Sequence, residues 1–453
     1  MSTIAAISTA QGNGGIGIVR ISGKETFNIL EKIFKPKEKA QIKGYTIKYG
    51  HIVDEKNEII DEVLVSYFIA PKSYTTENMC EINSHGNNVV LKRVLELCLK
   101  NGASLAEPGE FTKRAFLNGR IDLSQAEAVI DLINSKSIKE QKVSISQLNG
   151  GLSNTIHKIK NQILEELSDI EASIDYPEYD IEEKNRRKLK EKVEIVKKEL
   201  IKLESSFDNG KIIRDGIKVA IVGSPNAGKS TLLNALLNEE RSIVTNVEGT
   251  TRDTIEEFVT IQGVVFKIID TAGIRESKDV VEKIGIKRSL EAINTADLVI
   301  MIIDSSKKIS YKEEEILNKI KDKKIIIALN KCDLKGQKQD FSTLKKYTNN
   351  ILEISAINKE GLEELSNKMI EIFDVNAITT DSSEMITNIR HKNIISESIK
   401  ILKDIINTID KEIPIDMCAI YLRDLIEKMN EITGENVTED IINKIFSKFC
   451  LGK

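Results

Sequence analysis

The sequence predicts a multidomain protein with an α+β domain at the N-terminus, an all-α helical bundle, and an α/β domain inserted into that bundle. Three patterns lead to this fold class. Short β-like runs separated by turns fill residues 1–118, two long amphipathic stripes follow in residues 119–215, and strands alternate with helices over residues 216–375. Residues 376–453 return to helical periodicity, so we expect them to complete the bundle.

Composition limits the possible functions. The 453 residues suffice for about three domains. Lys and Arg total 66 against 70 Asp and Glu, a net charge of −4, so nucleic-acid binding would need a local basic patch. The five cysteines lack C-x-x-C spacing, which favours a reducing compartment. We find no apolar run of about 18 residues and no basic leader, and therefore expect a cytoplasmic protein without a membrane span.

The N-terminal segment carries the β-like runs of a small α+β domain. Residues 12–17 are rich in glycine, but no helix follows them as a dinucleotide-binding fingerprint requires, so we expect no nucleotide site there. Glycines in tight turns would also suit a plain oligomerisation module. The predicted elements are strands over residues 4–7, 18–21, 63–68 and 79–82 and a helix over residues 89–100.

Two stretches of the bundle show the apolar spacing of three and four that is typical of amphipathic helices. One stripe runs from Leu152 to Ile174, and the second runs from Leu189 to Leu203. The charged faces alternate in sign, which favours solvent exposure and leaves a dedicated RNA patch as the alternative.

The ends of the bundle helices are predicted from local signals. Ser124 and Glu127 have the spacing of a capping box, so a helix is expected to begin there. Residues 376–383 are small and polar and are interpreted as a linker. Further helices are predicted over residues 384–412, 414–429 and 438–449.

Residues 223–230 read Gly-Ser-Pro-Asn-Ala-Gly-Lys-Ser between a predicted strand and a predicted helix. Glycines allow a loop whose backbone N–H groups wrap a β-phosphate. Lys229 would place its ammonium between the β- and γ-phosphates, and the Ser230 hydroxyl would ligate Mg²⁺. The run therefore predicts a phosphate-binding loop. Apolar runs predict strands of the same domain over residues 218–222, 264–269, 325–329 and 351–354.

Four further segments follow this loop in the order of a guanine-nucleotide site. Thr251 would close over Mg²⁺, and Asp270 ends an apolar strand on the metal side. Asp333 can accept both guanine N–H groups, for which adenine has no equivalent, so the sequence favours GTP over ATP. The expected nucleotide contacts are Asn226, Ala227, Gly228, Lys229, Ser230, Thr231, Thr245, Asn246, Val247, Glu248, Gly249, Thr250, Thr251, Asp270, Thr271, Ala272, Gly273, Asn330, Lys331, Asp333, Ser355 and Ala356.

One position departs from the Ras-like pattern. Ile274 follows Gly273, where Ras-like proteins carry a glutamine that positions water. Because an aliphatic side chain cannot orient water, hydrolysis needs another polar group and a replacement for the arginine charge. Glu282 is the candidate for the water, with a solvated surface carboxylate as the alternative. The Asn226 amide oxygen is the candidate for holding a monovalent cation against the phosphates.

Four segments carry a resemblance to a known family over essentially the whole chain, namely residues 14–23, 108–119, 270–276 and 449–453. The chain resembles the MnmE/TrmE family of bacterial tRNA-modification GTPases, and the last segment is the most specific mark of that family. Residues 450–453 either dock on the protein or fray, as chain ends commonly do.

The resemblance implies that the N-terminal domain binds a tetrahydrofolate derivative, 5,10-methylene- or 5-formyl-tetrahydrofolate. Its one-carbon unit is destined for C5 of the wobble uridine of certain tRNAs. Some relatives carry Lys where this chain has Arg120, and a planar guanidinium is not equivalent to a point ammonium. Cys450 is a candidate catalytic nucleophile, with a docked structural thiol as the alternative. The implied folate contacts are Arg20, Glu81, Arg120 and Lys453.

For the α/β domain the resemblance implies a K⁺-activated GTP hydrolase in which Glu282 orients the water. It also implies a homodimer through the N-terminal domains and a heterotetramer-type complex with the flavoprotein MnmG, also called GidA. Together they would add aminomethyl or carboxymethylaminomethyl groups to the uridine. The alternative is a regulatory ribosome-assembly-type GTPase that binds RNA without one-carbon chemistry. The implied metal ligands are Ser230 and Thr251 for Mg²⁺, and Asn226, Thr245, the Val247 carbonyl and Thr250 for K⁺.

Overall fold

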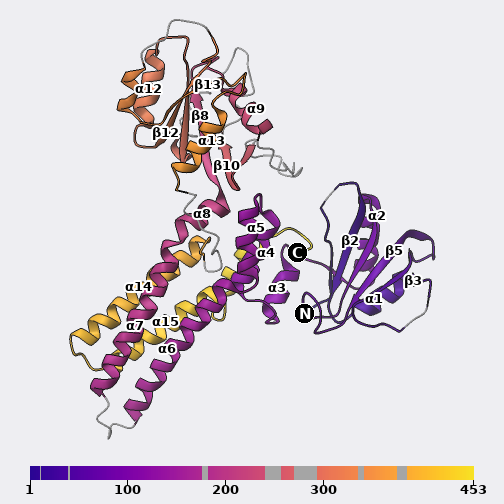
Figure 1. Ribbon diagram of the computed structural model, residues 1–453. Helices are drawn as coiled ribbons and strands as arrows, with labels where there is room; N and C mark the ends of the chain where they lie inside the picture. Colours follow the sequence, from indigo (N-terminus) through magenta and orange to yellow (C-terminus); the bar gives the residue numbers. More distant parts are fainter. Residues whose placement is uncertain are drawn as a thin grey trace. The chain divides into compact units, whose positions relative to one another are not determined.

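The computed structural model describes residues 1–10, 12–38, 41–175, 182–239, 257–269, 293–334, 341–374 and 385–453. Within these ranges the chain divides into two compact units, each assembled from separate stretches of sequence. The first unit comprises Met1–Ile130, Leu148–Lys190 and Asp404–Lys453, and the second comprises Asp131–Gln147 and Glu191–Lys403. Figure 1 labels many of their helices and strands.

The first unit begins with a seven-stranded sheet of strand order β3-β4-β5-β6-β2-β1-β7. Neighbouring strands are antiparallel except β1 and β7, which run parallel. Helices α1 and α2 pack residues such as Leu30 and Val94 against one face of this sheet. The bounds are β1 Ile4–Ile7, β2 Gly14–Ser22, α1 Thr26–Ile33, β3 Phe34–Pro36, β4 Thr46–Val53, β5 Ile59–Phe68, β6 Met79–Gly86, α2 Asn88–Lys100 and β7 Ser104–Leu105.

The glycine-rich stretch lies largely inside β2. The strand predicted from residue 18 begins at Gly14, and its pairing with β6 is irregular between Gly14 and Gly17. A Cβ atom at Gly17 would stand 2.7 Å from a methyl group of Leu91, so the missing side chain lets α2 approach the strand. Close packing within a strand, rather than a tight turn, therefore accounts for Gly17.

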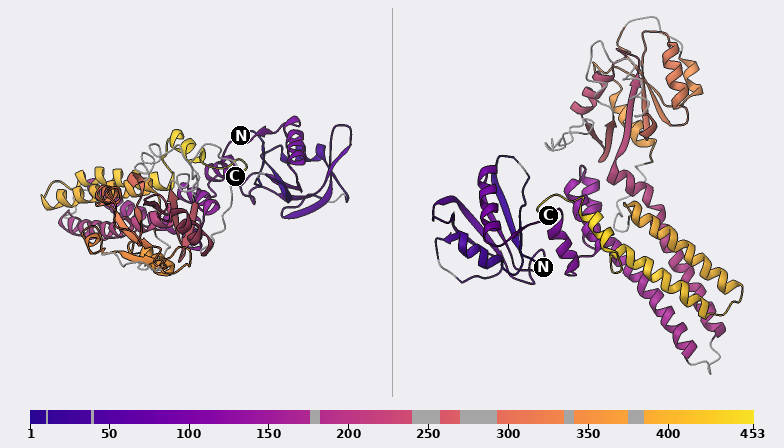
Figure 2. Two further views of the ribbon diagram at one scale, coloured as in Figure 1. Left: turned by 90° about the horizontal axis from the view of Figure 1, so that it is seen from above. Right: turned by 180° about the vertical axis from the view of Figure 1, so that it is seen from behind.

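Helices make up the remainder of the first unit and part of the second. In the first unit α6 and α15 lie side by side in opposite directions (Figures 1 and 2), since Lys160 bonds Asn430 whereas Glu171 bonds Arg423. Both predicted apolar stripes are buried, the first as far as Ile170 among the described side chains. The bounds are α3 Glu110–Leu117, α4 Leu123–Asn134, α5 Ile138–Leu148, α6 Gly151–Asp175, α7 Glu182–Ser205, α8 Phe207–Asp215, α14 Ile389–Asp410, α15 Asp416–Thr433 and α16 Glu439–Phe446.

The capping box of α4 lies two residues before its predicted place. The Asp122 carboxylate accepts the Gln125 N–H at 2.9 Å, and the Gln125 side chain accepts the Asp122 N–H at 3.0 Å. Ser124 instead donates its hydroxyl to Asp122 at 2.8 Å. The predicted pair of Ser124 and Glu127 is thus wrong, because Asp122 and Gln125 satisfy the same spacing rule one half-turn earlier.

The helix predicted from residue 384 begins later, at Ile389. Asn388 accepts the Arg390 N–H at 2.9 Å, which is a capping interaction that favours a start at this point. The preceding backbone is held outside the helix, because Gln147 donates its side-chain amide to the Met385 carbonyl at 2.9 Å. The predicted linker over residues 376–383 lies outside the described residues.

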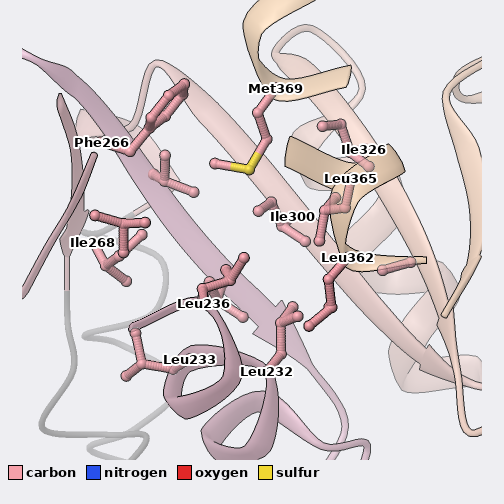
Figure 3. Close-up of a cluster of buried hydrophobic side chains, with 14 of the residues drawn as sticks. Leu232, Leu233, Leu236, Phe266, Ile268, Ile300, Ile326, Leu362, Leu365 and Met369 are labelled. Carbon is pink, nitrogen blue, oxygen red and sulfur yellow. The ribbon is translucent and has the colours of Figure 1, made fainter. Parts of the chain in front are cut away.

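The second unit contains a six-stranded sheet of order β13-β12-β11-β8-β10-β9, parallel except for β9. Figure 3 shows leucines of α9 and residues of α13 such as Met369 packed on strand residues such as Phe266 and Ile300. Helix α12 packs Leu317 against apolar strand residues that form another buried cluster. This cluster shares no residue with the one drawn in Figure 3. The bounds are β8 Ile217–Gly223, α9 Lys229–Glu239, β9 Glu257–Ile261, β10 Val264–Ile269, β11 Leu298–Asp304, α12 Tyr311–Ile320, β12 Lys324–Asn330, β13 Ile351–Ile354 and α13 Leu362–Glu371.

The predicted fold class is confirmed: the chain has an α+β domain, helical segments, and an inserted parallel α/β domain. The strands predicted in the α/β domain coincide with β8, β10, β12 and β13 within about two residues. Because the carboxyl ends of parallel strands meet at one edge of a sheet, this topology gathers the loops that follow β8, β11 and β12.

Candidate functional site

The phosphate-binding loop connects β8 to α9. Asn226 adopts a left-handed conformation with φ of 64°, and Gly228 has φ of 105°. Lys229 donates its ammonium to the carbonyl oxygens of Gly223 at 2.8 Å and Ser224 at 3.0 Å, so its charge lies inside the curve of the loop. Burial lowers the pKa of this ammonium from its ordinary value. The loop thus has the shape and charge to hold an anionic phosphate.

Asn330, at the end of β12, joins the phosphate loop to the base-binding segment. Its side-chain amide donates to the Ala227 carbonyl at 2.8 Å, and its amide oxygen accepts the Ala356 N–H at 3.0 Å. The side chain is buried, with 3% exposed. A Cβ atom at Gly228 would stand 2.1 Å from the Asn330 amide nitrogen, so glycine is required for this contact. The fold therefore brings the predicted residues of three separate segments together.

Asp333 lies beside this bridge with its carboxylate oriented by a neighbour. The Ser355 hydroxyl donates to one of its oxygens at 2.6 Å, and the residue is exposed. Lys331 has φ of 69° and pairs its ammonium with Asp304 at 2.7 Å. Asp304 was not predicted from the sequence, although it ends the apolar strand β11 in the same way that Asp270 ends a predicted strand. An oriented, accessible carboxylate here suits a ligand with two adjacent N–H donors.

The remaining predicted contacts of this site divide into two groups. Ser230 and Thr231 lie in the first turn of α9, where the exposed Ser230 fits an oxygen ligand for Mg²⁺, and the exposed Asn226 fits one ligand for K⁺. The other predicted contacts lie outside the described residues: Thr245, Asn246, Val247, Glu248, Gly249, Thr250, Thr251, Asp270, Thr271, Ala272, Gly273 and Glu282.

A pocket of about 630 Å³ lies in the first unit and contains three of the four predicted folate contacts, Arg20, Glu81 and Arg120. Its size is in the range of small-molecule sites. Lys453 does not belong to the lining. The lining consists of Arg20, Tyr45, Phe68, Pro71, Lys72, Ser73, Tyr74, Thr76, Met79, Glu81, Asn118, Gly119 and Arg120.

Arg20 and Glu81 form the polar wall of this pocket. They are cross-strand neighbours on β2 and β6, and the Arg20 guanidinium donates to one Glu81 oxygen through Nε at 2.9 Å and Nη2 at 2.8 Å. Nη1 of Arg20 donates to the Gly452 carbonyl at 3.1 Å. The pair is therefore fixed in place by the sheet register and by the last residues of the chain.

These last residues are docked rather than frayed. The Ser8 hydroxyl donates to the Gly452 carbonyl at 3.0 Å, and the Phe111 N–H donates to the Lys453 carbonyl at 3.2 Å. Gly452 has φ of 85°, and a Cβ atom there would stand 2.3 Å from the Ile7 carbonyl oxygen. Cys450 has a free, exposed thiol close in sequence to this dock. Lys453 thus directly follows Gly452, whose carbonyl oxygen accepts a hydrogen bond from Arg20.

The described helices include none that is both long enough and apolar enough to cross a membrane.

Two family models match the chain in succession. The model described as "GTP-binding protein TrmE N-terminus" matches residues 3–120, and the model described as "MnmE helical domain" matches residues 123–450. The curated protein named tRNA modification GTPase MnmE of Acetivibrio thermocellus is 49% identical over 455 residues, covering 100% of this chain and 99% of that protein. The protein of the same name from Clostridioides difficile is 48% identical over 455 residues, with the same coverage.

A third protein of that name, from Finegoldia magna, is 48% identical over 453 residues and covers 99% of both chains. The likeness extends over the sheet, the helices and the phosphate-binding loop described above. From its fold, its guanine-type site and its full-length similarity to these proteins, we conclude that the chain belongs to the MnmE family of tRNA modification GTPases.

Proposed function

We propose that this chain is a K⁺-activated GTP hydrolase that acts with the flavoprotein MnmG in modifying C5 of the wobble uridine of certain tRNAs. The names of the full-length relatives support the action on tRNA. The observation that carries the nucleotide assignment is the Asn330 bridge, which aligns the phosphate loop with the carboxylate of Asp333.

For hydrolysis we assign the attacking water to Glu282 and one Mg²⁺ ligand to Ser230, with Thr251 as the second. Asn226 would hold K⁺ together with Thr245, the Val247 carbonyl and Thr250, and the cation would supply positive charge beside the phosphates. The left-handed, exposed Asn226 supports this placement. The protein itself then contributes the fixed loop and the half-buried Lys229.

For the N-terminal pocket we propose a tetrahydrofolate derivative as ligand. Its volume, the polar pair Arg20 and Glu81, and the aromatic lining together suit a flat ligand with hydrogen-bonding edges and an anionic end. Cys450, exposed near the dock, is our candidate thiol for the transfer chemistry. We further propose a homodimer through the N-terminal domains and a cytoplasmic location. As domain limits we propose residues 1–118, 119–215, 216–375 and 376–453.

Replacing Glu282 by Ala tests the hydrolytic assignment. We expect the rate of phosphate release in K⁺ buffer to fall by about a hundredfold or more, with affinity for a fluorescent GTP analogue retained. In Na⁺ buffer the unmodified protein should be slow as well. The control is Glu315→Ala, which removes an exposed carboxylate that pairs with Lys319 on α12. Equal turnover of the Glu282 variant, or equal turnover in Na⁺, would contradict the assignment.

Calorimetric titration with 5-formyltetrahydrofolate tests the pocket. We expect one binding event per chain, lost in Arg20→Ala because the guanidinium that joins Glu81 to the Gly452 carbonyl is removed. No heat of binding to the unmodified chain would instead favour a regulatory GTPase of the ribosome-assembly type.

A further inference from the structure

Tyr74 occupies a central position in the N-terminal pocket that neither its sequence context nor the family assignment explains. It lies in the connection between β5 and β6 and lines the pocket. Its ring packs against a small buried cluster that includes Ile4 and Phe111. Its hydroxyl is hydrogen-bonded to the fully buried Thr112 at 2.9 Å. The ring is therefore held at both its apolar and its polar ends.

The guanidinium of Arg120 is held by Tyr74 through two different contacts. Its Cζ atom lies 4.7 Å from the centroid of the Tyr74 ring, within the range of cation–π attraction. Its Nη1 donates to the Tyr74 carbonyl at 3.1 Å. A planar fork can face a ring and donate to a carbonyl at once, whereas a lysine ammonium offers a single compact charge. The arrangement is thus selective for arginine.

Arg20 differs from Arg120 in its charge balance. Arg20 is 5.8 Å from the same ring centroid, but its charge is compensated by Glu81 at 2.8 Å. In the described part of the chain no carboxylate lies within ion-pair distance of Arg120, which is exposed at the pocket. Arg120 is therefore a wall residue whose positive charge remains available to an anionic ligand, alongside the exposed Lys72 of the same lining.

The loop that carries Tyr74 is anchored on both sides. Asn118 donates its side-chain amide to the Thr75 carbonyl at 2.7 Å. The Glu77 carboxylate accepts from Ser22 at 2.8 Å and from Arg114 at 3.0 Å, and the Arg114 side chain is 3% exposed. These bonds connect the loop to β2 and to α3. Tyr74 is consequently part of a preorganised wall.

We propose that Tyr74 is a positioning residue, whose ring and carbonyl fix the Arg120 guanidinium so that it meets the anionic part of a tetrahydrofolate-class ligand. This inference rests on the proposed folate function. Without the ring, an exposed arginine samples many rotamers, and binding must then order it at an entropic cost. With the ring, part of that ordering precedes ligand binding.

The contact itself is tested without ligand, by NMR of the arginine side-chain Nε–H groups in the full chain. We expect the Arg120 resonance to carry a ring-current shift that persists in Tyr74→Phe and disappears in Tyr74→Leu. The matched control is Tyr45→Leu, because Tyr45 lines the same pocket but makes an edge-to-face contact with Phe68 rather than facing a guanidinium. An Arg120 resonance that is unaffected by Tyr74→Leu would overturn the proposal.

The effect on binding is tested with a double-mutant cycle and calorimetric titration of 5-formyltetrahydrofolate. We expect Arg120→Lys to weaken binding about tenfold, which corresponds to about 1.4 kcal/mol, and to have almost no further effect in Tyr74→Leu. In the Tyr45→Leu background the Arg120→Lys effect should remain the full tenfold. Strictly additive effects of Tyr74→Leu and Arg120→Lys would overturn the positioning role.

The two possible failures can be told apart. If the unmodified chain binds no folate while the ring-current shift is present, the proposed ligand is wrong and the Tyr74 contact stands. If folate binds but the shift is absent, the ligand stands and the positioning role is wrong. If thermal unfolding shows that Tyr74→Leu is not folded, the Tyr74→Phe and Arg120→Lys variants decide. Full folate binding by Arg120→Lys overturns the proposal. A tenfold loss of binding by Arg120→Lys, together with full binding by Tyr74→Phe, supports it.

Discussion

Gly228 shows how one backbone position controls the nucleotide site. Its φ of 105° is unfavourable for residues with a side chain, and the space where a Cβ atom would lie is filled by the Asn330 amide. That amide contacts both the phosphate loop and the segment at Ala356. The glycine in the motif thus serves the base end of the site as well as the phosphate end.

We predict that Gly228→Ala weakens GTP binding by at least about tenfold, because displacement of Asn330 leaves buried groups unpaired at a cost of about 1–3 kcal/mol. Titration with a fluorescent GTP analogue measures this loss. Gly102→Ala is the control for backbone strain, since Gly102 has φ of 110° and a Cβ atom there would meet nothing within 4 Å. That variant should lose some thermal stability and keep its nucleotide affinity. Unchanged binding by Gly228→Ala would refute the role of the bridge.

Residues of the nucleotide site were predictable where a motif specifies both type and spacing. Asn330, Asp333 and Ser355 are predicted in this way, because each lies at or shortly after the end of an apolar strand. The side-chain bridge made by Asn330 was not predictable, since it depends on the approach of loops far apart in sequence. Tyr74 has no local signal at all, because its partner Arg120 lies 46 positions away.

At the scale of elements, α5 begins with a buried carboxylate. Glu140 accepts the Lys136 N–H at 2.6 Å, while its own N–H donates to the Ser137 hydroxyl at 3.1 Å. The pKa of Glu140 is raised to about 7, chiefly by burial and to a smaller extent by the charge of Asp131, while Lys136 and Ser137 oppose the shift. The side chain is 6% exposed. This helix start therefore titrates near neutrality.

The sign of the resulting pH dependence follows from the raised pKa. The folded state binds the Glu140 proton more tightly than the unfolded state does, so the contribution to stability is complete below pH 4.5 and is lost as the pH rises through about 7. We predict that Glu140→Gln removes this loss of stability at rising pH. The melting temperature of the variant should therefore exceed that of the unmodified chain by more at neutral pH than at acidic pH. Thermal unfolding across this range provides the measurement.

A matched control for Glu140 is Glu315→Gln on α12. Glu315 is exposed, and its hydrogen bond to Lys319 lowers its pKa below the ordinary value of 4.5. Its contribution to the stability of the protein is therefore lost on acidification below pH 4.5, outside the range from 4.5 to about 7 in which Glu140 titrates. The same melting-temperature difference for both variants would show that Glu140 does not titrate as expected.

Helix and strand existence was predictable in this chain, and helix starts were less so. The apolar stripes on α6 and α7 specify those helices because burial of one face dominates their stability. Starts depend on single capping bonds of about 1 kcal/mol, and the sequence around residues 122–127 offers two sets of capping residues at the same spacing. A hydrogen bond between the hydroxyl groups of Ser124 and Ser153, at 2.9 Å, favours the earlier one.

At the scale of the whole molecule, both units are built from stretches that are remote in sequence. In the first unit this arrangement brings Gly452 onto Ile7 and Ser8 and completes the wall at Arg20. An N-terminal fragment would contain the strands of the pocket but would lack this carbonyl partner of Arg20. Arg20 on the pocket wall is therefore held in place by residues that are far apart in sequence.

We predict that Gly452→Val displaces the last residues, because its side chain would collide with the Ile7 carbonyl, where a Cβ atom alone would come within 2.3 Å. Folate affinity should fall by several fold, and carboxypeptidase should release the last residues faster, while the melting temperature changes little. The control is Leu451→Ala, which alters an exposed side chain next to the dock. Resistance to carboxypeptidase equal to that of the unmodified chain would contradict the expected displacement.

The junction between α8 and β8 has a practical consequence for dissecting the second unit. Only Gly216 separates them, with φ of 72°, and Ile212 of α8 packs on the apolar cluster drawn in Figure 3. An expression fragment that started at residue 216 would remove this cover and leave apolar surface open to water, which promotes aggregation. A soluble nucleotide-binding fragment should therefore be started upstream of Phe207.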